Sequence, residues 1–238
     1  MKLLAKAAAT ALAGSLLLAA PGLGDSPASI DVHVAPYYNS AGPVINVGKY
    51  SSGLASKVPG EFVATIVRMK RQWSTLNFVE LYVGAIRLYD LAYRNEAAYW
   101  FYTAQLRGAQ FNALVDPNRI GGAGSRAFEL SRAHDAFSKH VTADIGGWAF
   151  GDVDTLETIV RQIQDENATV PPMQEMYPGV AFVHRSQWAQ KNAPIEADLE
   201  HFRNHLATNK AQIAKERAQN GTAAHFAGLT SRRFPGGF

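Results

Sequence analysis

Two apolar segments that flank a short polar break constrain the fold of this chain more than any other feature. They occupy residues 79–109, and the break is Arg94-Asn95. Small and apolar residues recur at helical spacing, at Ala85, Leu88 and Ala92 before the break and at Ala97, Phe101, Ala104 and Gly108 after it. Small side chains let two helices approach closely, while the aromatic residues fill the layer beside them. The pattern predicts an antiparallel helical hairpin.

The rest of the chain after Glu61 also has a helical pattern. Helices are predicted near residues 61–73, 76–93, 96–115, 125–141, 154–167, 180–191 and 194–220. The last of them carries its apolar residues in one narrow stripe, formed by Ile195, Leu199, Phe202, Leu206 and Ile213. The sequence therefore predicts an all-α fold, an irregular helical bundle of about seven helices with a short extended N-terminal arm.

Residues with capping chemistry mark several of these helix ends. Ser125 is a suitable N-cap after a glycine-rich stretch, and Asp154 with Glu157 has the spacing of a capping box. Asn192 is placed to cap the last helix, with Pro194 in its first turn.

The composition divides the chain into four parts. Residues 1–24 have the order of a secretory signal, with a basic start, an uncharged apolar run from Ala7 to Ala20 and a break of Pro and Gly. Residues 25–60 contain scattered Gly, Pro and Ser and predict an extended or loop-like arm. Residues 61–221 form the helical domain, and residues 222–238 predict a flexible C-terminal tail. The alternative is that Phe226, Phe234 and Phe238 dock this segment onto the domain.

The signal-like segment predicts export. Its apolar run is shorter than the ~20 residues of an ordinary membrane span. Cleavage after Ala20 and cleavage after Gly24 fit the small-residue rule equally, and an uncleaved N-terminal anchor is the alternative. We therefore expect an exported protein, periplasmic or secreted, with no stable membrane span after signal cleavage.

The composition excludes several classes of function. Because the chain has 0 Cys, it contains no disulfide, no thiol nucleophile, no Cys-ligated zinc and no iron–sulfur cluster. Its net charge of +3 comes from 23 basic and 20 acidic residues, and loss of Lys2 and Lys6 with the signal brings the balance closer to zero. Such a chain lacks the strong positive electrostatic field that attracts nucleic acid, so no nucleic-acid partner is expected.

A search for chemical motifs yields no predicted catalytic residue. The stretch from Gly42 to Tyr50 has one residue too many for a phosphate-binding loop, and Tyr stands where Ser or Thr should bind magnesium. His201 and His205 share one helix face, but two ligands do not close a metal site and the Glu of a zinc-hydrolase motif is missing. A solvated helix face is the better interpretation of this pair. We expect neither a metal nor a cofactor.

Polar groups set among aromatic residues provide the candidate binding residues. In the hairpin these are Tyr89, Asp90, Tyr99, Trp100, Tyr102, Gln105 and Arg107. Because Tyr, Trp and Arg dominate binding hot spots, this set predicts a polar groove with aromatic walls. Trp148 and Asp152 are candidates for a second rim of that groove. The alternative is that these groups satisfy one another inside the fold.

The same segments resemble a known group of proteins. The resemblance rests on Arg87-Leu88-Tyr89-Asp90-Leu91, Asn95-Glu96-Ala97, Tyr99-Trp100-Phe101-Tyr102, Gln105-Leu106-Arg107 and Gly147-Trp148-Ala149-Phe150-Gly151-Asp152. These blocks look like segments of exported bacterial proteins of unknown function, and the hairpin resembles one unit of a tetratricopeptide or Sel1-like repeat. No second copy follows at a period of ~34–40 residues, so a single hairpin is expected rather than a solenoid. The resemblance implies a bacterial source and, by analogy with Sel1-like hairpins, contacts with proteins, but no activity.

Two functions from different classes follow. The first is an exported, non-catalytic protein that binds another protein in the cell envelope, for which an immunity protein against a delivered toxin is one concrete form. The alternative is a cell-envelope hydrolase whose acid and base groups are scattered along the chain.

Overall fold

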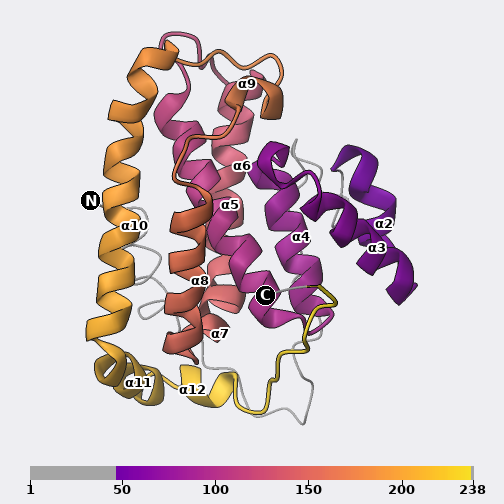
Figure 1. Ribbon diagram of the computed structural model, residues 1–238, viewed down its shortest axis with the longest axis vertical. Coiled ribbons are helices and arrows are strands. Elements are labelled where there is room, and N and C mark those ends of the chain that lie inside the picture. Colours follow the sequence, from indigo (N-terminus) through magenta and orange to yellow (C-terminus); the bar gives the residue numbers. More distant parts are fainter. Residues whose placement is uncertain (1–46, 237–238) are drawn as a thin grey trace.

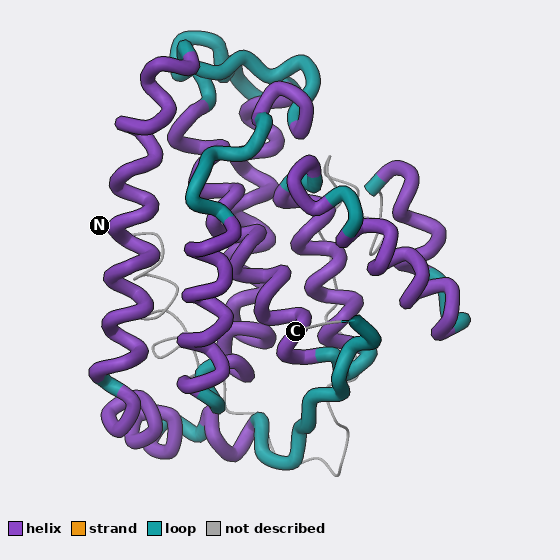
Figure 2. Tube along the Cα trace, viewed as in Figure 1, coloured by secondary structure: helices purple, strands orange, loops and turns teal. Residues whose placement is uncertain are grey.

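The computed structural model describes residues 47–236, and its regular elements are helices (Figure 1). They are α2 (Ser51–Ala55), α3 (Pro59–Lys70), α4 (Phe78–Asp90), α5 (Arg94–Leu114), α6 (Arg126–Val141), α7 (Gly147–Ala149), α8 (Val153–Glu166), α9 (Met173–Met176), α10 (Trp188–Thr208), α11 (Lys210–Gln219) and α12 (Thr222–His225). Within this part of the chain there is no strand, only an isolated antiparallel bridge between Val115 and Phe182 (Figure 2). The prediction of an all-α fold is confirmed. None of the described helices is long and apolar enough to cross a membrane.

Helix α5 forms the centre of the domain. It contacts α4, α6, α8 and α10, and Figure 1 shows it behind α8, between α10 and α4. Nearly all of its 21 residues are buried, including Trp100, Phe101 and Phe111. A helix that is enclosed on every side has no polar face to keep in water, so its sequence shows no amphipathic stripe.

Helices α4 and α5 form the predicted hairpin. The chain turns between them at residues 91–93, where Ala92 adopts a left-handed conformation with φ 64°. Asn77 starts α4 as part of a capping box, since its side chain accepts from the backbone N–H of Glu80 and the Glu80 side chain accepts from that of Asn77. The turn and the cap together fix where α4 begins and ends.

Two glycines allow close helix approach, Gly84 between the two helices of the hairpin and Gly108 between α5 and α6. A β-carbon on Gly84 would lie 2.6 Å from the Trp100 ring, and one on Gly108 would lie 2.0 Å from Nδ1 of His134. The imidazole of His134 is fully buried in contact with α5, and its Nδ1 is 3.1 Å from the hydroxyl of Tyr82. Both contacts require a residue without a side chain.

The predicted helix ends are confirmed in part. Ser125 caps α6 by accepting from the backbone N–H of Phe128. The cap of α8 is Asp152 rather than Asp154, because the Asp152 carboxylate accepts from the backbone N–H of Thr155 at 3.0 Å.

The predicted break at Asn192 was wrong. Helix α10 begins at Trp188, runs through Pro194 and ends at Thr208, so the predicted helices 180–191 and 194–220 are divided elsewhere. The Asn192 side chain is buried, where it accepts from Gln110 of α5 at 3.1 Å and donates to Glu196 at 2.6 Å. Tertiary partners for the amide override its capping preference.

Both ends of the described chain pack against the domain more than the composition predicts. Of the predicted arm, residues 48–55 form helical turns, with Tyr50 and Leu54 buried against α3 and α4. The predicted signal at 1–24 and the remainder of the arm up to residue 46 lie outside the described residues.

The segment predicted as a flexible tail packs against the domain. After α12 it runs to the α4–α5 turn, as the yellow trace in Figure 1 shows. There the backbone N–H of Arg232 donates to the carbonyl of Ala92 at 2.7 Å, and Phe234 packs edge-on against Tyr93. Phe226 and Phe234 are both buried, which corrects the prediction for residues 222–236. The aromatic residues supply apolar contacts that offset the entropy of ordering the segment.

The close contact at Gly108 predicts a strong effect of one methyl group. We expect Gly108→Ala to lower the free energy of unfolding by about 1–3 kcal/mol, because the new β-carbon overlaps the His134 ring. Urea denaturation measures the change. Gly60→Ala in α3 is the matched control, since a β-carbon there meets nothing within 4 Å, and it should leave stability unchanged or slightly higher. Equal effects of the two substitutions would contradict the packing described.

The buried histidine predicts a pH dependence of stability. Burial lowers the pKa of His134 from 6.5 to about 4, so the folded state binds fewer protons than the unfolded state between these values. Stability should therefore fall as the pH drops from 6.5 to 4, by up to about 3 kcal/mol from this residue. The measurement is denaturation across this range for the wild type and His134→Gln. A wild-type loss no steeper than that of the variant would contradict the assignment.

Candidate functional site

A small pocket lies between the end of α3, the middle of α5 and the end of α8. Its volume is about 270 Å³, and its lining residues are Lys70, Trp73, Tyr99, Gln162 and Glu166. Tyr99 belongs to the predicted binding set. The rings of Trp73 and Tyr99 stack at 5.1 Å between centroids, so the aromatic wall of this pocket is rigid.

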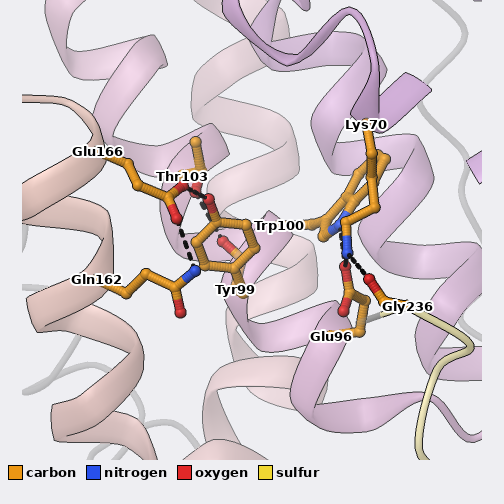
Figure 3. Close-up of polar contacts among 8 residues, drawn as sticks. All are labelled: Lys70, Glu96, Tyr99, Trp100, Thr103, Gln162, Glu166 and Gly236. Atoms are coloured by element: carbon orange, nitrogen blue, oxygen red, sulfur yellow. Dashed lines mark hydrogen bonds and ion pairs between the residues drawn. The ribbon is translucent and has the colours of Figure 1, made fainter. Parts of the chain in front are cut away.

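The carboxylate at the mouth of the pocket is already hydrogen-bonded. Glu166 accepts from the Tyr99 hydroxyl through Oε2 and from Nε2 of Gln162 at 2.6 Å through Oε1 (Figure 3). Burial, and next the hydrogen bond to Glu166, raise the pKa of Tyr99, so its hydroxyl stays protonated and keeps donating. The backbone carbonyl of Tyr99 in turn accepts from Thr103. These contacts hold the acid in one orientation.

A second carboxylate, Glu96, is buried beneath the same region. Its Oε1 pairs with Nζ of Lys70 at 2.8 Å and accepts from the Trp100 indole at 2.9 Å (Figure 3). Lys70 also reaches the carbonyl of Gly236 in the C-terminal segment at 3.4 Å. Because Glu96 is 3% exposed and ion-paired, it serves to join α3, α5 and the C-terminal segment.

Arg107 connects α5 to the loop between α3 and α4. Its Nη1 donates to the carbonyls of Trp73 at 2.7 Å and Leu76 at 2.5 Å, and its guanidinium lies 5.4 Å from the Trp73 ring centroid. Burial lowers the pKa of Arg107 to about 10, which leaves the group charged at neutral pH. The residue is 2% exposed, so it positions Trp73 and does not reach solvent.

The remaining hairpin residues of the predicted set also lie inside the domain. Tyr89 is buried, which raises its pKa to about 12, and Asp90 pairs with Arg87 at 2.9 Å. Tyr102 packs against Phe202 of α10, and Gln105 donates to Ser138 of α6 at 3.0 Å. The expected exposed groove along the hairpin is therefore not present, because α6, α8, α10 and the C-terminal segment cover it. The structure favours the alternative, in which these groups lie inside the fold and most of them find partners there, although the hydroxyl of Tyr89 has no hydrogen-bond partner among the described residues.

The two residues predicted as a second rim lie together in a groove at the other end of α8. The groove has a volume of about 410 Å³ and lies between the α7–α8 region and the α11–α12 region. It is lined by Trp148, Phe150, Gly151, Asp152, Val153, Ala214, Arg217, Ala223, Phe226 and Leu229. We call it the Trp148 groove. Trp148 is only partly buried, and Asp152 is exposed.

Arg217 forms part of the groove wall, and the sequence analysis did not select it. It is 6% exposed and donates through Nη1 to the carbonyl of Gly147, and its guanidinium lies 5.8 Å from the Phe226 ring centroid. Burial lowers its pKa. No sequence signal identifies this residue, because a basic side chain near the end of a helix is usually solvated.

The histidine pair on α10 has no arrangement typical of a metal site. His201 is exposed and His205 is partly buried, and His205 Nδ1 lies 3.2 Å from the side-chain amide of Asn209. Within residues 47–236 no three His, Cys, Asp or Glu side chains are grouped closely enough to hold a metal ion.

Comparisons of the chain with protein-family models, with curated proteins and with solved structures found no match. The function proposed below is therefore argued from the geometry of the chain itself.

The contacts of Arg107 predict that it is essential for stability. We expect Arg107→Met to lower the free energy of unfolding by about 2–4 kcal/mol, because two carbonyls lose their buried donor. Urea denaturation followed by circular dichroism measures the loss. Arg161→Met, which removes an exposed arginine from α8, is the control and should change stability by less than ~0.5 kcal/mol. A tolerated Arg107→Met would show that the loop is held in another way.

Proposed function

We propose that this protein is an exported, non-catalytic protein of the bacterial cell envelope that binds another protein through the Trp148 groove. The observation that carries the proposal is the position of Trp148. A partly exposed tryptophan beside an exposed carboxylate, at the edge of an apolar groove, is the kind of surface on which binding hot spots form.

The state of the carboxylates near the smaller pocket supports binding over hydrolysis. Glu96 is ion-paired with Lys70, and Glu166 accepts two hydrogen bonds from neighbouring side chains. An acid–base pair for hydrolysis needs groups that can exchange protons with a substrate. Here the protein's own side chains contact Oε1 of Glu96 and both oxygens of Glu166, so we assign the two acids to structural support.

Export is the second part of the proposal and rests on the N-terminal pattern of a basic start, an apolar run and a small-residue break. An immunity protein that covers the active site of a delivered toxin is one concrete form of this function. Such a partner would contact roughly 800 Å² on each protein, so the groove would form the centre of a wider interface.

Site-specific crosslinking tests the proposal. A photoreactive benzoylphenylalanine replaces Ala223, which is exposed and lines the groove, in cells grown alone and in contact with competing bacteria. We expect one discrete protein adduct, identified by mass spectrometry. The control places the same group at Val58, an apolar residue that is 54% exposed and lies outside the groove, and it should give no such adduct.

An absence of adducts from Ala223 in both growth conditions would contradict the proposal. So would the same adducts at equal yield from Val58, since these would report non-specific contact.

A further inference from the structure

The Trp148 groove contains a buried cation, Arg217. Among the ion pairs of residues 47–236, none includes Arg217. Burial lowers the pKa of this guanidinium. A guanidinium has five N–H donors, and the Arg217 group donates one hydrogen bond, to the carbonyl of Gly147. Donors remain for a ligand, and the natural ligand of a guanidinium is a carboxylate or another planar anion.

Apart from Asp152 and Arg217, the residues that line the groove are apolar or small. Trp148, Phe226 and Leu229 line it together with small residues of α11 and α12. A carboxylate that reaches Arg217 must therefore carry an apolar group next to it, which would exclude water and strengthen the charge pair.

The charges at the rim restrict the ligand further. Asp152 is exposed there and accepts from the Thr155 hydroxyl at 2.7 Å, while Asp154 is paired with Lys210. An exposed carboxylate disfavours a second negative charge at the entrance. The groove thus fits a ligand with a single anionic group at its inner end.

The guanidinium is held in place before any ligand arrives. It donates to the carbonyl of Gly147 and packs against Phe226, and a β-carbon on Gly151 would lie 3.3 Å from its Nη2. Gly151 leaves space next to the donor, and fixed donors lower the entropy cost of binding.

We propose that the groove binds the C-terminal carboxylate of a partner protein whose last residue is apolar, an inference that rests on the proposed function. Arg217 pairs with the carboxylate, and the last side chain lies against Trp148 and Phe226. The chain terminus is the place in a protein where a carboxylate and an apolar side chain share one Cα atom. An internal Asp or Glu carries its carboxylate at the tip of the side chain, with no apolar group beyond it.

Calorimetric titration of the full chain with short peptides tests this assignment. The probe is acetyl-Ser-Gly-Leu-Phe with a free carboxylate, and its C-terminal amide is the matched ligand. We expect binding of the acid and at least tenfold weaker binding of the amide. Equal affinity of the two peptides, or no binding of either, would overturn the inference.

Two variants locate the site on the protein. Arg217→Met should weaken binding of the acid at least tenfold, whereas Arg161→Met, which removes an exposed arginine of α8 that does not line the groove, should leave it unchanged. Circular dichroism verifies that each variant is folded. If Arg217→Met does not fold, Ala223→Trp replaces it, since a large side chain on this exposed residue of the groove lining should reduce the affinity for the acid and leave the fold intact. Unchanged affinity in a folded groove variant would overturn the inference.

Decanoate distinguishes a peptide terminus from a free fatty acid. Decanoate binding that depends on Arg217, with no binding of the peptide acid, would overturn the assignment to a protein terminus. A groove-specific crosslink from Ala223 combined with no peptide binding would leave the proposed function intact and reject only this inference.

Discussion

The rest of this structure depends on the burial of one helix that carries charged and amide side chains. Helix α5 lies at the centre and carries Glu96, Arg107 and Gln110 into the interior, where each needs a partner. Lys70, the backbone of the α3–α4 loop and Asn192 supply these partners. Because an unsatisfied buried polar group costs more than a hydrogen bond gains, the surrounding elements are specified by polar contacts as well as by apolar packing.

The same constraint explains which parts of the fold follow from the sequence. The hairpin and the cap at Ser125 depend on local spacing, and they agree with the prediction. The break expected at Asn192 and the free C-terminal tail do not, because both depend on partners that are far away in the sequence. A capping preference of about 1 kcal/mol yields to a buried hydrogen-bonded network.

The candidate site was predicted only in part for a related reason. Aromatic residues with polar groups between them are typical both of a binding surface and of a buried helix, and in the hairpin the second interpretation applies. Trp148 and Asp152 were selected and do line a groove. Arg217 and Phe226, which complete it, lie more than 60 residues further along the chain, and no spacing rule connects them to Trp148.

The central claim is that the hairpin forms the core and that Trp148 is accessible to solvent at the edge of its groove. Hydroxyl-radical footprinting of the purified protein tests it directly, because the rate of side-chain oxidation follows solvent access. Trp148 should oxidise readily, while Trp100, which is 0% exposed, should be protected as long as the protein is folded. Fast oxidation of Trp100 together with a protected Trp148 would contradict the account.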